Sequence, residues 1–302
     1  MLRSRTLAAL LLGPLAPLAL RAQDAMAAMA GMADVHHHAP APASAAVRRQ
    51  IDSVARAVAS LGTPAAAAAA GLAPVFGWIP TMGVHWVDRA TMTKAAQSDR
   101  AHPGQLMFSR VAGRDSLVGV AYGYFASVGD TVTPALFAGA PRWHEHPDRA
   151  PAGETLVMLH VWFVASPDGP FAGTNPNLPF WALGLAAPDA ARMHDPAFGG
   201  VVRRAALALA ELADSTAIFP QVKDRPDVAP MLAARRDSIR TLVTELRAAE
   251  RAKDATRWDR AAERAAAQWD ALYATYLASA RTAAGKERMQ RYVAMLLGQH
   301  GE

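Results

Sequence analysis

Residues 156–164 read LVMLHVWFV, an apolar run interrupted only by His160. Both alternating faces of the run are apolar, which is typical of a strand covered on both sides of a sheet. A buried histidine ring without a partner costs about 1–3 kcal/mol. The run therefore predicts a central strand in which His160 meets either a hydrogen-bond partner or a ligand.

The residues around this run, from 74 to 185, predict a mainly antiparallel β-sheet domain. Its other short apolar runs are 75–79, 82–87, 106–111 and 117–125. Gly113 and Asp115 lie between the last two runs, so we expect a β-hairpin with a loop of about five residues there. Four prolines after residue 166 exclude regular structure until about Phe180.

From Pro188 onward the spacing of apolar residues is helical. Residues 200–214 predict one helix, and heptad-spaced apolar residues over 229–282 predict a long αα-hairpin, with Asp254 as the N-cap of its second helix. The residues expected to form its packed core are Leu232, Ile239, Leu242, Leu246, Trp258, Trp269 and Leu272. A last helix is expected over 286–297.

The N-terminus has the composition of a secretory signal peptide. Arg3 and Arg5 precede an apolar run, 7–20, which is broken by two prolines and followed by Ala22. A permanent membrane span takes about 20 apolar residues, so we expect cleavage after Ala22 and no transmembrane anchor afterwards. The predicted location is secreted or periplasmic.

The complete prediction is an α+β protein with a β-rich domain followed by a helical domain. The expected segments are a signal peptide (1–22), a disordered tail rich in Met, His, Ala and Pro (23–46), an N-terminal helix with a linker (47–73), the β-rich domain (74–185) and the helical domain (186–302). The chain carries a formal charge of +5, and cleavage removes Arg3, Arg5 and Arg21, leaving +2. A nearly neutral mature chain excludes a nucleic-acid partner on electrostatic grounds, and the lack of cysteine excludes disulfides.

Four histidines of the β-rich domain are candidate metal ligands. They are His85, His144, His146 and His160. His144 and His146 are two residues apart, so in an extended chain both rings project from the same side. Glu145, Asp148 and Glu154 are nearby carboxylates that could complete or orient such a site. Imidazole suits both Zn and Cu, so the candidate cofactor is a divalent ion of either metal.

The tail provides a second candidate set of metal ligands. It consists of His36, His37, His38, Met26, Met29 and Met32. Thioether sulfur suits Cu(I), so this segment could collect copper, and the alternative is a low-complexity linker that binds nothing. His102 and His194 are interpreted as structural residues of a loop or helix end.

The motifs of residues 77–180 occur in an order that resembles a family of uncharacterised secreted bacterial proteins. The motifs are MG-x-H (82–85), LVGVAY (117–122), PALFAG (134–139), LHVW (159–162), P-x-G-x-F (167–171) and NP (175–176). The chain departs from the family in reading SPDGPF where NP-x-G-x-F is usual, and its C-terminal helices have no counterpart there. The resemblance implies no reaction, and it marks His85 and His160 as the most characteristic histidines.

Three functions remain open from the sequence. The leading one is a non-catalytic exported protein that binds a metal ion or small ligand through the β-domain histidines. The second is a metal-dependent, hydrolase-like enzyme in which the same histidines hold a metal-bound water. The third is an envelope interaction module whose helical hairpin contacts a protein partner. Whether the four histidines converge is the observation that these functions depend on.

Overall fold

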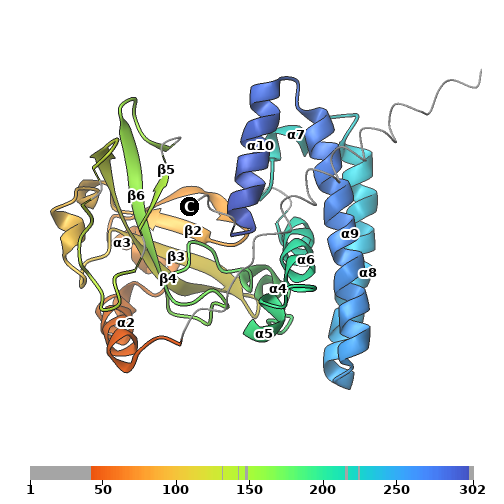
Figure 1. Ribbon diagram of the computed structural model, residues 1–302, viewed down its shortest axis with the longest axis horizontal. Helices are drawn as coiled ribbons and strands as arrows, with labels where there is room; N and C mark the ends of the chain where they lie inside the picture. The colour runs from red at the N-terminus through yellow and green to blue at the C-terminus, as the bar shows by residue number, and fades with distance from the viewer. Residues whose placement is uncertain are drawn as a thin grey trace, which may run out of the picture.

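The computed structural model describes residues 42–130, 132–141, 143–146, 149–214, 217–223 and 225–298. A six-stranded antiparallel sheet occupies the N-terminal half and a group of helices follows it, which confirms the α+β prediction (Figure 1). The predicted signal peptide and the methionines and histidines of the tail lie outside the described residues.

The sheet has the strand order β1-β2-β3-β4-β6-β5, and every neighbouring pair is antiparallel. The strands are β1 (Ala73–Ile79), β2 (Gly83–Val87), β3 (Gln105–Val111), β4 (Arg114–Ser127), β5 (His144–His146) and β6 (Glu154–Trp162). Two short 3-10 turns, η2 (Arg89–Thr91) and η3 (Ala96–Ser98), lie between β2 and β3. β6 lies between β4 and β5 and is buried from Val157 to Trp162, so the predicted central strand is confirmed.

The β3–β4 hairpin is confirmed, but the predicted loop of about five residues is wrong. Ala112 and Gly113 alone separate the strands, with φ angles of 48° and 78°. Two consecutive residues with positive φ form the tight turn whose twist matches that of the flanking strands. The strands can therefore continue through Ser116 and Asp115, which the sequence had suggested for the loop.

One face of the sheet is covered by α2 (Ala45–Ala57), followed by η1 (Ala59–Leu61) and α3 (Pro64–Ala69). Val47, Ile51 and Val54 of α2 pack in one core with Tyr122 and Leu159 of the sheet. The helix begins two residues before the predicted start, inside the segment assigned to the tail. The reason is Ser44, whose hydroxyl accepts a hydrogen bond from the Val47 amide and so caps the helix.

The helical half begins after a long loop. Its helices are α4 (Leu178–Ala182), α5 (Ala190–Met193), α6 (Gly199–Ala213), α7 (Pro220–Lys223), α8 (Ala229–Ala252), α9 (Ala255–Ser279) and α10 (Ala283–Leu296). α8 and α9 form the predicted hairpin, and α10 lies between them and the sheet (Figure 1). The Asp254 carboxylate accepts from the Arg257 amide at 2.9 Å, which confirms the predicted cap. No helix within the described ranges is long and apolar enough to cross a membrane.

All seven residues predicted for the hairpin core are buried, and they share one hydrophobic core with α6 and α10. Trp269 is fully buried and stacks on Tyr273 with ring centroids 5.8 Å apart. Within the described part of the hairpin, Met231 is the large apolar residue that stays exposed. The heptad stripe is therefore internal core, as the sequence pattern most simply predicts.

Candidate functional site

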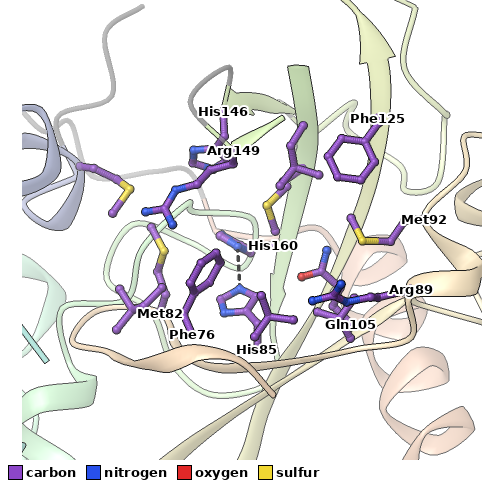
Figure 2. Close-up of a pocket in the computed structure, with 16 residues that line it drawn as sticks. Phe76, Met82, His85, Arg89, Met92, Gln105, Phe125, His146, Arg149 and His160 are labelled. Atoms are coloured by element: carbon purple, nitrogen blue, oxygen red, sulfur yellow. Dashed lines mark hydrogen bonds between the residues drawn. The ribbon is translucent and has the colours of Figure 1, made fainter. Parts of the chain in front are cut away.

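His85 and His160, called the histidine pair below, meet on the face of the sheet opposite α2. His85 lies on β2 and His160 on β6, with β3 and β4 between these strands. Their Nε2 atoms are 3.2 Å apart, and the two side chains are 6% and 1% exposed. Figure 2 shows this contact as a dashed line, with Phe76 beside it and His146 and Arg149 above it. Two residues 75 positions apart in sequence therefore share one buried polar contact.

Small residues on β4 make this meeting possible. Gly119, Ala121 and Gly123 lie on the same face as the histidine pair, and Ala121 is directly opposite His160. A Cβ added at Gly119 would lie 2.5 Å from the Val161 carbonyl oxygen, and one at Gly123 would lie 2.5 Å from a side-chain nitrogen of Gln105. Larger side chains do not fit here, so the rings of the neighbouring strands can extend toward each other over this small-residue strip.

The local backbone structure explains why the MG-x-H motif has a glycine at position 83. This glycine opens β2 with φ of +78°, and a Cβ there would lie 2.4 Å from the carbonyl oxygen of Phe108. Only glycine combines that backbone conformation with so close an approach. Two residues later, His85 projects from the same side of the strand and reaches the site.

The protonation of the pair follows from its hydrogen bonds and its burial. The Gly173 carbonyl can only accept, so Nδ1 of His160 donates to it at 2.7 Å and carries the proton. Burial lowers the pKa of His85 to about 4, with the charge of His146 as a smaller cause. Burial, followed by the nearby histidines, also holds the pKa of His160 well below its usual value. The pair is neutral at pH 7, and Nε2 of His160 presents a lone pair toward His85.

His144 and His146 lie next to the pair, so the four predicted histidines converge. The ring centroids of His144 and His160 are 5.0 Å apart, and those of His144 and His146 are 4.9 Å apart. The prediction that both β5 rings project together agrees with this spacing. Across the described segments, however, no group of three or more His, Cys, Asp or Glu side chains stands in an arrangement that could hold a metal ion.

The carboxylates expected beside the site are not arranged as predicted. Glu145 alternates with the two histidines on β5 and is exposed, and Glu154 is exposed at the start of β6. Neither lines the cavity at the histidine pair. Asp148 lies outside the described residues. Strand alternation places Glu145 on the opposite side from its histidine neighbours, and Glu154 is six residues, about 20 Å of extended chain, before His160.

A cavity of about 330 Å³ opens above the histidine pair. His85, His146 and His160 line it together with Gln105, Arg89 and Arg149, and most of the remaining lining is apolar. Four of the lining residues are Met82, Met92, Met158 and Met295. These methionines were not predicted from the sequence as part of the site. The signal for one of them was visible, because Met158 precedes His160 by two residues on the same strand face.

The loop between β6 and α4 fixes the carbonyl that holds His160. On one side of Gly173, the Ala172 carbonyl accepts from Nε1 of Trp162 at 2.7 Å. On the other side, the Asn175 amide donates to the Thr81 carbonyl, also at 2.7 Å. Thr81 belongs to the turn that leads into β2. The same loop therefore joins β6 to the strand that carries His85.

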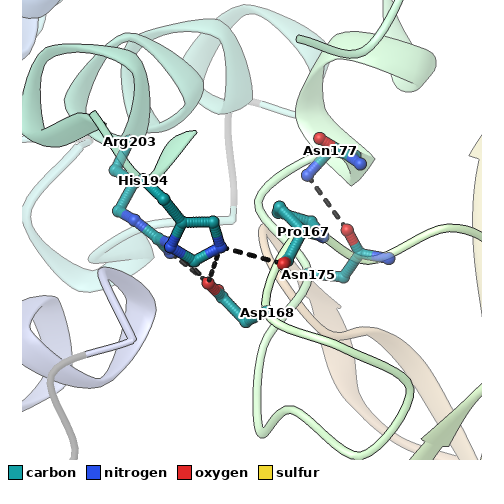
Figure 3. Close-up of polar contacts among 6 residues, drawn as sticks. All are labelled: Pro167, Asp168, Asn175, Asn177, His194 and Arg203. Atoms are coloured by element: carbon teal, nitrogen blue, oxygen red, sulfur yellow. Dashed lines mark hydrogen bonds and ion pairs between the residues drawn. The ribbon is translucent and has the colours of Figure 1, made fainter. Parts of the chain in front are cut away.

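The helical half anchors this loop through a partly buried ion pair. Arg203 of α6 donates to both carboxylate oxygens of Asp168, at 2.8 and 2.6 Å, and its side chain is 3% exposed (Figure 3). His194 caps α5 and its Nε2 atom contacts the Pro167 carbonyl at 2.9 Å. His194 is thus a structural residue at a helix end, as predicted. His102 is exposed in a turn, where it contacts Asp99.

No protein-family model, curated protein or solved structure matches this chain. The resemblance carried by MG-x-H and LHVW therefore stays a prediction. In the structure, each of these two motifs contributes one histidine to the same contact. The NP motif contributes the hydrogen bond from the Asn175 backbone N–H to the Thr81 carbonyl beside that contact.

Proposed function

We propose that this is an exported, non-catalytic protein that binds a metal ion through His85 and His160. The observation that carries the proposal is the distance of 3.2 Å between the two Nε2 atoms. Zinc–imidazole bonds of about 2.0–2.1 Å at a tetrahedral angle place two nitrogens about 3.3–3.4 Å apart. The pair therefore has nearly the spacing that two ligands of one ion require.

The surroundings of His160 support the same role. Metal-binding histidines usually donate their second ring nitrogen to a carbonyl or carboxylate, which fixes the tautomer and the ring orientation. The Gly173 carbonyl serves this purpose, and it leaves Nε2 of His160 as the ligating atom. Without an ion, the Nε2–H of His85 donates to that atom. When an ion binds, His85 must carry its proton on Nδ1 instead.

Isothermal titration of Zn(II), Ni(II) and Cu(II) into purified protein tests the proposal. The full chain is used, with the tail set His36, His37, His38, Met26, Met29 and Met32 replaced by alanine and leucine to silence it. An ion that binds only the folded state should raise the free energy of unfolding by about 2.7 kcal/mol at a hundredfold excess over its dissociation constant.

The matched variants compare buried and exposed histidines. His85→Gln and His160→Gln should abolish binding, whereas His102→Gln changes an exposed histidine and should leave it unchanged. If all three variants bind as the parent protein does, the histidine pair is not a metal site and the proposal is wrong.

A second candidate is a small organic ligand with an apolar body and an acidic group. Its support is the cavity itself, because about 330 Å³ of mostly apolar space suits such a molecule. Arg89 and Arg149 at the lining are its candidate anion contacts. Fluorescence titration with anilinonaphthalene sulfonate, an apolar anionic probe, tests this candidate. Saturable binding by metal-free protein that is lost in Arg89→Gln and Arg149→Gln would favour it over the metal ion.

A further inference from the structure

The methionines at the histidine pair point to a particular class of metal ion. Four of the 16 residues that line the cavity are methionines, although the chain has only 12 methionines among 302 residues. Thioether sulfur is a soft ligand that suits Cu(I), whereas carboxylate oxygen suits harder ions. The concentration of methionine at one place therefore carries chemical information beyond the apolar character of the lining.

Two of these methionines are paired with the two histidines along the chain. Met158 lies two residues before His160 on β6, so both side chains project from the same face of that strand. Met82 lies in the turn that leads into β2, three residues before His85. Both methionines are buried, at 7% and 4% exposure, and both line the cavity. Each side of the site thus offers one imidazole and one thioether.

Gly123 of the small-residue strip makes room for one of these thioethers. It lies opposite Met158 in the β4–β6 register, and a Cβ added there would lie 3.5 Å from Cγ of Met158. The Met158 side chain therefore extends over a position that has no side chain of its own. The opening that allows the histidine pair to meet also holds the sulfur-bearing side chain beside it.

The charges at the cavity oppose a monovalent cation less than a divalent one. Its lining in the described part of the chain contains Arg89 and Arg149 but no carboxylate. Guanidinium groups repel a divalent ion twice as strongly as a monovalent one at the same distance. His144 and His146 lie next to the pair, but no group of three or more His, Cys, Asp or Glu among the described residues is arranged to hold an ion. Thioether sulfur is a donor outside that set, and Met82 and Met158 supply it at the cavity.

We propose that the cavity is a Cu(I) site in which Met82 and Met158 supply thioether ligands to an ion held by His85 and His160. This inference rests on the proposed metal-binding function and narrows it to one ion and two further ligands. It also separates this site from the methionine-histidine tail, which was the segment suggested from the sequence for Cu(I).

Anaerobic competition for Cu(I) against bicinchoninate, with ascorbate as the reductant, tests the inference on the full chain with the silenced tail. Met82→Leu and Met158→Leu keep the side-chain volume, and cores tolerate such exchanges. Loss of a residue that only supports a metal ligand weakens metal binding about 10–100-fold. Each of these substitutions removes a proposed direct ligand and should weaken Cu(I) binding by at least that factor. Zn(II) affinity should stay unchanged in both. Met193→Leu, a buried methionine of the helical core, is the matched control and should alter neither affinity.

X-ray absorption provides a readout that folding defects cannot imitate. In selenomethionine-labelled protein, selenium should appear in the first coordination shell of bound Cu(I). The number of selenium neighbours should be smaller in Met82→Leu and in Met158→Leu than in the parent protein. Unchanged Cu(I) affinity in both methionine variants, with binding still lost in His160→Gln, overturns the thioether assignment and leaves the proposed function standing. Unchanged binding in His160→Gln as well overturns both.

Discussion

Two tyrosines of α9 allow the same chemical change to be made with opposite expected results. Tyr273 and Tyr276 are three residues apart, and both side chains are almost completely buried. The Tyr276 hydroxyl donates to a carboxylate oxygen of Glu211 at 3.1 Å. Among the described residues the Tyr273 hydroxyl meets no hydrogen-bond partner, and burial raises its pKa to about 12. Removing each hydroxyl therefore isolates the contribution of one buried polar group.

Tyr273→Phe should stabilise the protein or leave its stability unchanged. A buried polar group without a partner costs about 1–3 kcal/mol, so deleting the hydroxyl recovers up to that amount, less the small space that it vacates. Tyr276→Phe should lower the free energy of unfolding by about 1.5–3 kcal/mol, because a buried hydrogen bond to a charged group is lost.

Urea unfolding of the two variants, with the parent protein as reference, measures both effects as shifts of the transition midpoint at constant slope. Because the variants differ only in which hydroxyl of one helix is absent, errors of extrapolation largely cancel in the comparison. A loss of stability in Tyr273→Phe as large as that in Tyr276→Phe would refute the reasoning. It would mean that the Tyr273 hydroxyl is satisfied after all.

Three further predictions concern the fold and the site. Trp269→Ala should lower the free energy of unfolding by about 3–5 kcal/mol in the same assay, because the ring is fully buried, and an unchanged midpoint would place it at the surface. Asp254→Ala should cost about 1 kcal/mol through loss of the α9 cap, and Asp254→Asn, which keeps an acceptor, should cost less in urea unfolding. In metal-free protein, stability should be level above pH 6.5 and fall as pH drops from 6.5 to about 4, because the unfolded chain then binds protons at His85 and His160 that the folded chain does not. The lowering of the His85 pKa corresponds to about 3 kcal/mol of stability. The urea midpoints of the parent protein and of His85→Gln should therefore approach each other between pH 6.5 and about pH 4.

The long helices α6, α8, α9 and α10 could be predicted from local pattern, whereas the short helices α4, α5 and α7 were not predicted. The heptad pattern of α8 and α9 consists of apolar residues three or four positions apart. This local spacing alone predicted that Ile239 of α8 and Trp269 of α9 are buried. Asp254 marked the junction between the helices because capping is a local hydrogen bond. The β-hairpin was also local, but its turn was not recognised. Ala112 takes a positive φ that alanine rarely adopts, so the residue type did not indicate the turn.

The site was only partly predictable because it depends on strands that are distant in sequence. The residues around His85 and His160 showed that both were buried polar rings, and nothing local showed that they meet. Their contact depends on Gly119 and Gly123, two glycines inside β4. The role of these glycines is visible only when the neighbouring strands are in place. The carbonyl of Gly173 has no sequence signal at all, because every residue carries one. Met158 is different, since strand alternation alone places it beside His160.

The sequence separation of the two histidines also determines how much of the chain must be folded before the site forms. His85 lies on β2 and His160 on β6, so the contact requires both strands and the β3–β4 hairpin that lies between them. The contact joins residues 75 positions apart in sequence, and proteins rich in such non-local contacts fold more slowly than those with local ones. A fragment of the chain that lacks either strand also lacks the histidine pair. An ion bound as proposed would therefore join the second strand of the chain to the last, and its binding would report that the sheet is completely folded.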